Sequence, residues 1–245
     1  MSIPRLHTDT PLAPGIEIAL TPAQAHHIGH VLRRAPDAEL RVFNAREGEF
    51  AAELTALRKD RGTMRLGERL RAPAPEPELR ALIAALKREA MDWAVEKATE
   101  LGASIIQPVL TRRCVAGHSN TERLSKLARA AAEQCERLTL PRIGDAMPLH
   151  AVLDAWDGAP LLVAAERREA RPLHDILDII TAPCGFLVGP EGGFERAELD
   201  DLVRRPFVSL ATLGPRILRA ETALVAGLGA ISFTLDARRR FDTPL

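Results

Sequence analysis

Three prolines at alternate positions, in the stretch RAPAPEPEL between residues 71 and 79, constrain the fold of this chain more than any other feature. Proline has no backbone N–H and a fixed φ angle, so this stretch cannot lie inside a helix or a central strand. Alternating prolines favour a stiff, extended segment. We therefore predict two domains, with residues 1–72 in the first, residues 73–79 as a linker and residues 80–245 in the second.

The first domain is expected to be small and rich in β-structure. Runs typical of strands occur at residues 39–44, 48–57 and 63–70, and the polar stretch RKDRG separates the last two. One helix is expected at residues 21–34, because Thr21 is suited to cap its start and Pro22 to occupy its first turn.

The second domain has a different sequence pattern, in which apolar runs of strand length alternate with helical patterns. The expected strands lie at residues 79–86, 104–110, 160–166, 184–190 and 207–213. The expected helices lie at residues 89–102, 119–138, 195–203 and 221–233. This alternation is typical of an α/β fold with a mostly parallel sheet that helices cover on both faces.

The overall charge excludes a protein that binds nucleic acid through its global field. The 33 lysines and arginines balance 33 aspartates and glutamates, so an RNA-binding face would have to be local. A candidate is the segment from Arg112 to Arg142, where seven basic residues accompany three glutamates. A solvated helix face is the alternative for this segment.

Cysteine usage and hydropathy exclude several other classes. The three cysteines are far apart and form no CxxC pair, which argues against a disulfide framework or a zinc knuckle. His26 and His30 are four residues apart, but no further ligand follows at a metal-binding spacing, so no metal is expected. No run approaches the roughly 20 apolar residues of a membrane span, and the N-terminus lacks a leader pattern, so we expect a cytoplasmic protein without a membrane partner.

The first loop of interest is GPEGG, residues 189–193, which joins an apolar strand to a helix. Glycines allow a backbone to approach a ligand closely, and ligands of open α/β sheets bind at the carboxyl ends of strands. The loop matches neither the P-loop nor the GxGxxG pattern, and Glu191 would repel a phosphate. It therefore indicates a ligand without phosphate that could carry a positive charge, and a plain tight turn is the alternative.

The second loop places three charges at the entrance of an apolar helix. Leu213, Gly214 and Pro215 lead into Arg216, Arg219 and Glu221, and the helix follows. Charges beside apolar packing are costly unless they are paired or face a ligand. Either Arg219 and Glu221 form a clamp that caps the helix, or these groups face a bound molecule.

Six stretches in order along the chain resemble the ribosomal RNA small subunit methyltransferase E family, the 16S ribosomal RNA uridine N3-methyltransferases of the SPOUT group. They are LVGPEGGF (187–194), LGPRILRAETA (213–223), ALKREAMDWAVEKATELGA (85–103), TRRC (111–114), AAEQCERL (131–138) and HHIGHVLRR (26–34). The resemblance covers nearly the whole chain. It departs from the family at residues 35–40, APDAEL, where the family more often has a glycine turn.

The resemblance implies a fold, a cofactor and partners. The first domain would be a PUA-like RNA-binding β-barrel, and the second a SPOUT α/β domain with a trefoil knot near the two loops. The cofactor would be S-adenosylmethionine, the protein a homodimer, and the substrate 16S ribosomal RNA in the assembled small subunit. Two alternatives remain: a SPOUT enzyme for another RNA, and a ribosome-assembly factor that binds RNA without catalysis.

The resemblance and the chemistry of the loops together nominate site residues. Arg219 would stabilise the uridine anion as it forms, Glu221 would orient Arg219 or accept the proton, and Arg216 is the alternative electrophile. The residues expected to line the cofactor pocket are Gly189, Pro190, Glu191, Gly192, Gly193, Leu213, Gly214, Ile217 and Leu218. The residues expected to contact RNA are Arg33, Arg34, Lys87, Lys97, Arg112, Arg113, Gln134 and Arg137. Because the chain has no tyrosine and only 4% aromatic residues, stacking of bases on aromatic rings is expected to be minor.

Overall fold

The computed structural model describes residues 3–114, 120–165 and 170–242. It divides into two compact units, one of residues 1–75 with 132–140 and one of residues 76–131 with 141–245. The division near residue 75 falls within the proline-rich stretch. The assignment of residues 132–140 to the first unit was not expected, because nothing local in that stretch marks it as separate from its helix.

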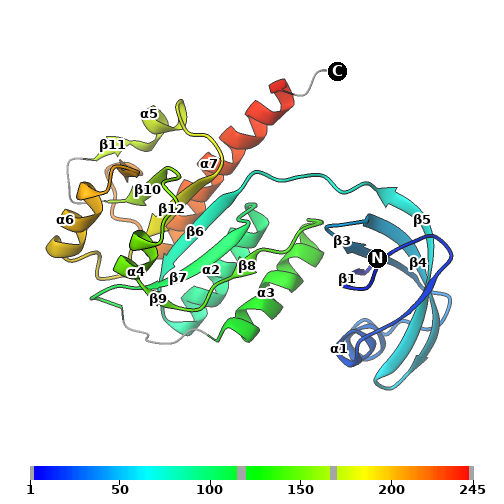
Figure 1. Ribbon diagram of the computed structural model, residues 1–245. Coiled ribbons are helices and arrows are strands. Elements are labelled where there is room, and N and C mark those ends of the chain that lie inside the picture. The colour runs from blue at the N-terminus through cyan, green and yellow to red at the C-terminus, as the bar shows by residue number, and fades with distance from the viewer. Residues whose placement is uncertain (1–2, 115–119, 166–169, 243–245) are drawn as a thin grey trace. The chain divides into compact units, whose positions relative to one another are not determined.

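The first unit is built on a curved, five-stranded sheet, drawn in blue to cyan in Figure 1. Its strands are β1 (Arg5–His7), β2 (Glu17–Ala19), β3 (Glu39–Asn44), β4 (Gly48–Arg58) and β5 (Arg61–Arg71), in the order β1-β3-β4-β5-β2. The three longer strands were expected from their sequence patterns. The strands β1 and β2 have only three residues each and carry no recognisable pattern. Irregularities in the β4 and β5 pairing curve the sheet around its apolar core.

The helix expected at residues 21–34 is shorter and less regular than its pattern indicates. The α1 helix (Pro22–His26) begins at Thr21, which forms a capping box with Gln24, and a π-helical turn, η1 (His27–Val31), follows. Shortly afterwards Asp37 has φ +69°, in the left-handed region that favours glycine. This is the stretch where the sequence lacks the glycine turn of the family it resembles.

The second unit contains an eight-stranded parallel sheet. Its strands are β6 (Leu79–Ala84), β7 (Ile105–Leu110), β8 (Arg142–Ile143), β9 (Met147–Pro148), β10 (Leu161–Ala164), β11 (Arg171–Pro172), β12 (Cys184–Val188) and β13 (Val208–Thr212). The order is β11-β13-β10-β12-β6-β7-β8, and β9 pairs with β7. The five expected strands are all present. The additional strands β8, β9 and β11 have two residues each.

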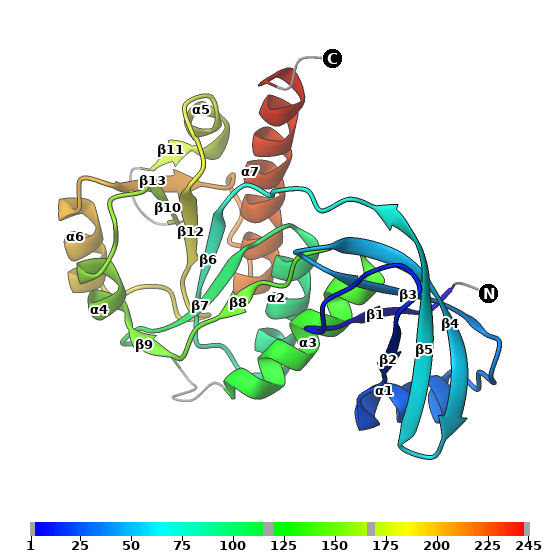
Figure 2. The same ribbon diagram turned by 45° about the vertical axis from the view of Figure 1, so that its right-hand side comes forward.

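Helices cover both faces of this sheet, as expected (Figure 2). Along β6, Ala81 and Ile83 join a core that includes side chains of α2 (Arg88–Glu100) and α7 (Ala220–Asp242). Leu82 and Ala84 join a core that includes side chains of α4 (Leu149–Asp154) and α6 (Arg196–Arg204). Successive side chains of a strand point to opposite faces, which explains the alternation. The helices are α2 (Arg88–Glu100), α3 (Thr121–Gln134), α4 (Leu149–Asp154), α5 (Leu173–Leu177), α6 (Arg196–Arg204) and α7 (Ala220–Asp242).

The last helix, α7, corrects one expectation from the sequence. By length and composition alone, residues Ala220–Arg239 could cross a membrane, so the chain does contain a stretch of that kind. Leu224, Leu228 and Ile231 of this helix are fully or almost fully buried in the core of the second unit. A core helix passes the same test of length and composition, so the test is weak evidence for a membrane span.

Candidate functional site

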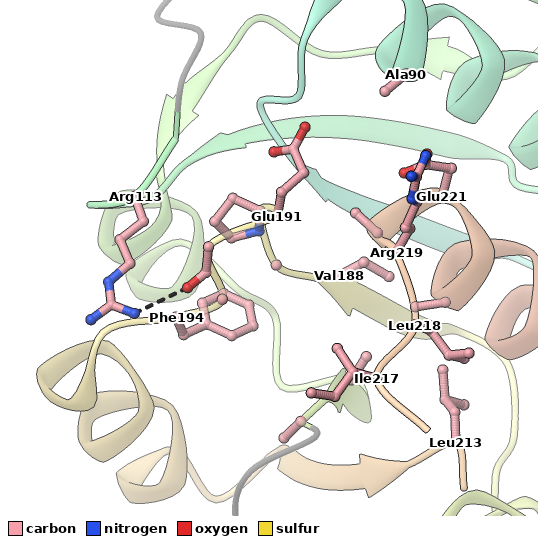
Figure 3. A pocket seen from close by; sticks show the side chains of 18 of the residues that line it. Ala90, Arg113, Val188, Glu191, Phe194, Leu213, Ile217, Leu218, Arg219 and Glu221 are labelled. Atoms are coloured by element: carbon pink, nitrogen blue, oxygen red, sulfur yellow. Dashed lines mark hydrogen bonds between the residues drawn. The ribbon is translucent and has the colours of Figure 1, made fainter. Parts of the chain in front are cut away.

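A pocket of about 820 Å³ lies at the carboxyl ends of three neighbouring strands, β13, β10 and β12 (Figure 3). Val188 ends β12, Ala164 ends β10 and Thr212 ends β13, and all three line the pocket. Because parallel strands present their carboxyl ends at one edge of a sheet, the loops that follow them converge there. The strand order therefore brings together the two loops that the sequence singles out.

The glycine loop, residues 189–193, forms one wall of the pocket. A Cβ atom on Gly189 would lie 2.8 Å from the ring of Phe194, so no larger residue fits this position without displacing the ring. Gly193 has φ +69°, and its N–H donates a 2.8 Å hydrogen bond to the carbonyl oxygen of Pro190. The side chain of Glu191 is labelled on this wall in Figure 3. The loop is thus a tight turn that also exposes backbone to the pocket.

The second loop, residues 213–219, forms the adjoining wall. Gly214 has φ +115°, and its N–H donates to the hydroxyl of Thr212 at 3.3 Å. Leu213 and Leu218 pack against the core of the second unit, whereas Ile217 is 69% exposed and lines the pocket. This wall combines apolar side chains with bare backbone.

The charged cluster stands where this wall meets α7. Arg216 and Arg219 are exposed, Glu221 is half-buried in the first turn of α7, and all three line the pocket. Among the described residues, no hydrogen bond or ion pair is recorded for any of these three side chains. Figure 3 shows Arg219 and Glu221 on the same side of the pocket. Within the described residues, Arg219 and Glu221 therefore do not form the ion pair that would cap the helix. Both side chains remain available to a ligand.

The first turns of α2 supply the wall beside α7, and three of their pocket residues were not expected. Lys87 directly precedes the helix, and Glu89, Ala90 and Trp93 follow on one face. Residues three and four apart share a helix face. Helical spacing alone places Trp93 on the same face of α2 as Glu89 and Ala90. The sequence does not show that this face lines the pocket.

A further loop, TRRC at residues 111–114, is attached to the glycine loop. The Nη1 atom of Arg113 donates a 3.0 Å hydrogen bond to the carbonyl oxygen of Gly192, drawn as a dashed line in Figure 3. The backbone N–H of Arg112 donates to Oε1 of Glu198 at 2.8 Å, and its guanidinium lies 3.6 Å from Glu195. Arg113 is thus in contact with the pocket wall itself.

The other residues expected to bind RNA do not gather at the pocket. The ammonium of Lys97 is held by Glu96 and Glu100, whose hydrogen bonds raise its pKa. Arg137 is only 9% exposed, and its Nε donates to the hydroxyl of Thr139. Burial and local pairing leave these two cations poorly placed to contact phosphate. The remaining three belong to the first unit, where Arg33 and Gln134 are exposed and Arg34 is half-buried.

The described part of the chain shows no cluster suited to a metal ion, and the buried thiol of Cys184 is not activated. It contains no group of three or more histidine, cysteine, aspartate or glutamate side chains placed to hold a metal ion. The rings of His26 and His30 stack on each other with centroids 4.8 Å apart. Burial raises the pKa of Cys184 to about 11, so this thiol is not a nucleophile at neutral pH.

Comparison with known proteins places these features in a family. A model described as "RNA methyltransferase domain" matches residues 73–232, and one described as "RNA methyltransferase PUA domain" matches residues 20–66. A relative from Rickettsia conorii named "Ribosomal RNA small subunit methyltransferase E" is 33% identical over 94% of this chain and 96% of its own length. A protein of that name from Bacillus subtilis is 28% identical over 90% of this chain and 91% of its own length.

A solved structure agrees over nearly the same length. The ribosomal RNA small subunit methyltransferase E of Neisseria gonorrhoeae, crystallised with S-adenosyl methionine, superposes with a TM-score of 0.87 at 27% identity. The superposition covers 96% of this chain and 98% of that protein.

Proposed function

Since this chain belongs to the ribosomal RNA small subunit methyltransferase E family, we propose that it transfers a methyl group from S-adenosylmethionine to N3 of a uridine in 16S ribosomal RNA. It is an RNA methyltransferase in which a PUA-like sheet precedes a SPOUT α/β domain. The observation that carries the proposal is the pocket at the ends of β12, β10 and β13, where the glycine loop meets Arg216, Arg219 and Glu221.

The residues present fit S-adenosylmethionine. A Cβ atom on Gly193 or Gly214 would meet no heavy atom within 4 Å, so both glycines leave bare backbone facing open space. Backbone groups at such positions can bond an adenine and a ribose, and Ile217 and Leu218 offer apolar surface to the adenine. No lysine follows the glycine loop to grip a phosphate, and the carboxylates of Glu191 and Glu221 suit a sulfonium. The set that would hold the cofactor is Gly189, Pro190, Glu191, Gly192, Gly193, Leu213, Gly214, Ile217 and Leu218.

When bound, S-adenosylmethionine supplies the electrophilic methyl group. The protein contributes positioning of the base and control of its charge, since N3 of uridine must lose its proton before or during transfer. Arg219 donates to O2 or O4 of the uracil and stabilises the negative charge that develops there. The carboxylate of Glu221 accepts the N3 proton or holds Arg219 in place, and Arg216 is the alternative donor to the base. Holding both reactants in line contributes much of the rate.

The trefoil knot is part of the proposal, and the order of the strands supports it. After β10 the chain forms β11, which pairs with β13 at the sheet edge, then β12 on the other side of β10, and then it crosses back to β13. It then returns in α7, which contacts β12 and β6. A path that crosses and returns in this way is what a knot at the two pocket loops requires, against the usual rule for protein chains.

Two partners are part of the proposal: a second copy of this chain and 16S ribosomal RNA. Family membership and the exposed residues named below support them. Phe233 of α7 is 69% exposed, and Thr222 and Ala226 lie exposed on the same helix at helical spacing, which supports a symmetric homodimer through α7. The balanced net charge supports a substrate read by shape, namely 16S ribosomal RNA in the assembled small subunit of the cytoplasm. Arg33, Arg34 and Gln134 of the first unit and Lys87, Arg112 and Arg113 of the second would contact this RNA; Arg137 and Lys97 are left out because of their burial and pairing.

The test is methyl transfer from labelled S-adenosylmethionine to small subunits from a strain that lacks this protein, with naked 16S RNA in parallel. Mass spectrometry of the nucleosides should show 3-methyluridine, with subunits preferred over naked RNA. A different methylated nucleoside, or label in transfer RNA, would contradict the proposed specificity. Failure to take up the cofactor in a calorimetric titration would favour a ribosome-assembly factor without catalysis.

A further inference from the structure

Trp93 is a large aromatic side chain kept partly in solvent at the pocket. It lies on α2, is 40% exposed and lines the pocket together with Glu89 and Ala90. The neighbouring residues Ala94 and Val95 are fully buried, so the helix is firmly packed beneath it. Figure 3 shows Ala90, one turn before Trp93, on the side of the pocket where Glu191 and Glu221 lie.

The other tryptophan, Trp156, makes structural contacts with its neighbours in the fold. The indole N–H of Trp156 donates a 2.6 Å hydrogen bond to the carbonyl oxygen of Ala159. The Arg80 guanidinium lies 4.9 Å from its ring centroid, and Phe207 stacks on it at 6.3 Å. For Trp93, the described residues provide no hydrogen bond, ring contact or cation contact. The part of the Trp93 ring that is exposed at the pocket is therefore available to contact a ligand.

The surroundings of Trp93 suit a nucleobase more than an apolar ligand. Lys87 precedes it on the same wall, and Arg219 and Glu221 line the pocket at the start of the adjoining helix, α7. A base taken out of its stack needs a flat apolar surface for its face and polar groups for its edge. The indole supplies the flat surface, and Arg219 and Glu221 supply the polar groups. Lys87 can neutralise the adjoining phosphate.

We propose that Trp93 forms a nucleobase subsite, on which the extruded target pyrimidine stacks while Arg219 and Glu221 contact its edge. This inference rests on the proposed function. It gives aromatic stacking a larger role than the sequence alone indicates, because one well-placed ring is sufficient for a single base. The indole holds the base and takes no part in proton or methyl transfer.

Steady-state methylation of small subunits tests the subsite through three variants. Trp93→Leu keeps an apolar side chain but loses the flat ring, and we expect it to raise KM for the RNA roughly five- to a hundredfold. Trp93→Phe keeps a ring and should restore most of the affinity. Ile179→Ala shortens an apolar side chain that is 70% exposed and lies outside the pocket lining, and it should leave KM unchanged. Affinity for S-adenosylmethionine should be the same in all three.

Other outcomes distinguish failure of the stacking role of Trp93 from failure of the proposed function. An unchanged KM for Trp93→Leu, or a lost dimer in sedimentation with normal chemistry per dimer, would overturn the stacking role and make Trp93 an ordinary surface or interface residue. If the unchanged protein methylates no 16S RNA, the proposed function itself fails.

Fluorescence tests the subsite independently of activity. The chain has only two tryptophans, so Trp156→Phe leaves Trp93 as the single indole. A base stacked on an indole quenches its emission. We expect a uridine-containing oligonucleotide to quench this variant, whereas the Trp93→Phe variant, which retains Trp156, should show no change. Equal quenching in both variants, or none in either, would overturn the proposal.

Discussion

The Nη1 atom of Arg113 donates a 3.0 Å hydrogen bond to the backbone carbonyl oxygen of Gly192. This bond joins a loop at the end of β7 to the glycine loop at the end of β12, although the two residues are 79 positions apart. In the proposed function the glycine loop contacts the cofactor through its backbone, so we expect a side chain that holds its carbonyl to affect cofactor binding.

Arg113→Ala is therefore expected to weaken binding of S-adenosylmethionine roughly two- to tenfold, since one hydrogen bond contributes about 0.5–1.5 kcal/mol. Isothermal titration calorimetry measures this change. Arg112→Ala is the matched control, because the side chain of Arg112 is exposed and lies outside the pocket lining. If Arg113→Ala instead binds the cofactor normally and lowers the salt slope of RNA association by about one, Arg113 contacts phosphate as the sequence first indicated.

Replacement of Arg219 should separate chemistry from cofactor binding. We expect Arg219→Ala to lower kcat for methyl transfer roughly 100- to 1,000-fold, because it removes a donor to the charge that develops on the base. Affinity for S-adenosylmethionine should change little. Single-turnover transfer and calorimetry measure the two quantities, and Arg196→Ala, an exposed change on α6, is the control. A normal rate for Arg219→Ala with a large loss for Arg216→Ala would assign the role to Arg216.

The two glycines Gly214 and Gly158 allow backbone strain to be separated from loss of ligand contact. Both have positive φ, +115° and +88°, and a Cβ atom on either would meet no heavy atom within 4 Å. Alanine at either position should therefore cost about 1–3 kcal/mol of unfolding free energy through strain alone. Gly214 lies in the pocket and Gly158 lies outside its lining.

Urea unfolding should consequently show similar losses for Gly214→Ala and Gly158→Ala, whereas calorimetry should show weakened cofactor binding only for Gly214→Ala. Equal cofactor affinity in the two variants would mean that the backbone at Gly214 does not contact the ligand.

The first unit contains a buried ionic cluster whose stability should depend on pH. Glu49 is fully buried and accepts hydrogen bonds from Nε of Arg5 at 2.5 Å and from Nε of Arg71 at 2.7 Å. Burial, the largest single influence, raises the pKa of Glu49, but the hydrogen bonds and charges of Arg5 and Arg71 together lower it below its ordinary value of 4.5. Arg5 also donates to the carbonyl oxygens of Ala132 and Glu133, which fixes residues near the end of α3 within this unit.

Because the folded-state pKa is the lower one, the stabilisation by Glu49 is complete above pH 4.5 and is lost as the pH falls through the folded-state pKa. Glu49→Gln should lose about 3–5 kcal/mol of unfolding free energy at pH 7, since it leaves two arginines without their buried partner. It should also flatten the fall of stability in acid. Urea unfolding between pH 3 and 7 measures both effects, with exposed Glu122→Gln as the control. An acid profile as steep as that of the unchanged protein would contradict this role for Glu49.

The local elements of the fold were predictable because their signals are local. The alternation of apolar runs and helical patterns after residue 79 predicted the five main strands and the parallel sheet, and Thr21 and Pro22 correctly marked a helix start. The two glycine-containing loops, which line one pocket, were singled out as candidate ligand loops because each follows a strand and contains residues that favour unusual backbone conformations. The short strands β1, β2, β8, β9 and β11 have too few residues to carry a pattern of their own.

The sequence by itself therefore determined the main strands of each unit, the two loops that follow β12 and β13 and the charged residues at the start of α7. The tertiary structure decided which of these groups meet. Placing β10 between β12 and β13 unites the two loops, the fold attaches Arg113 to Gly192 and turns Trp93 toward the pocket, and packing buries Arg137 within the first unit. The physical reason is that strand order and side-chain burial depend on contacts between residues far apart in the chain, which no local pattern specifies.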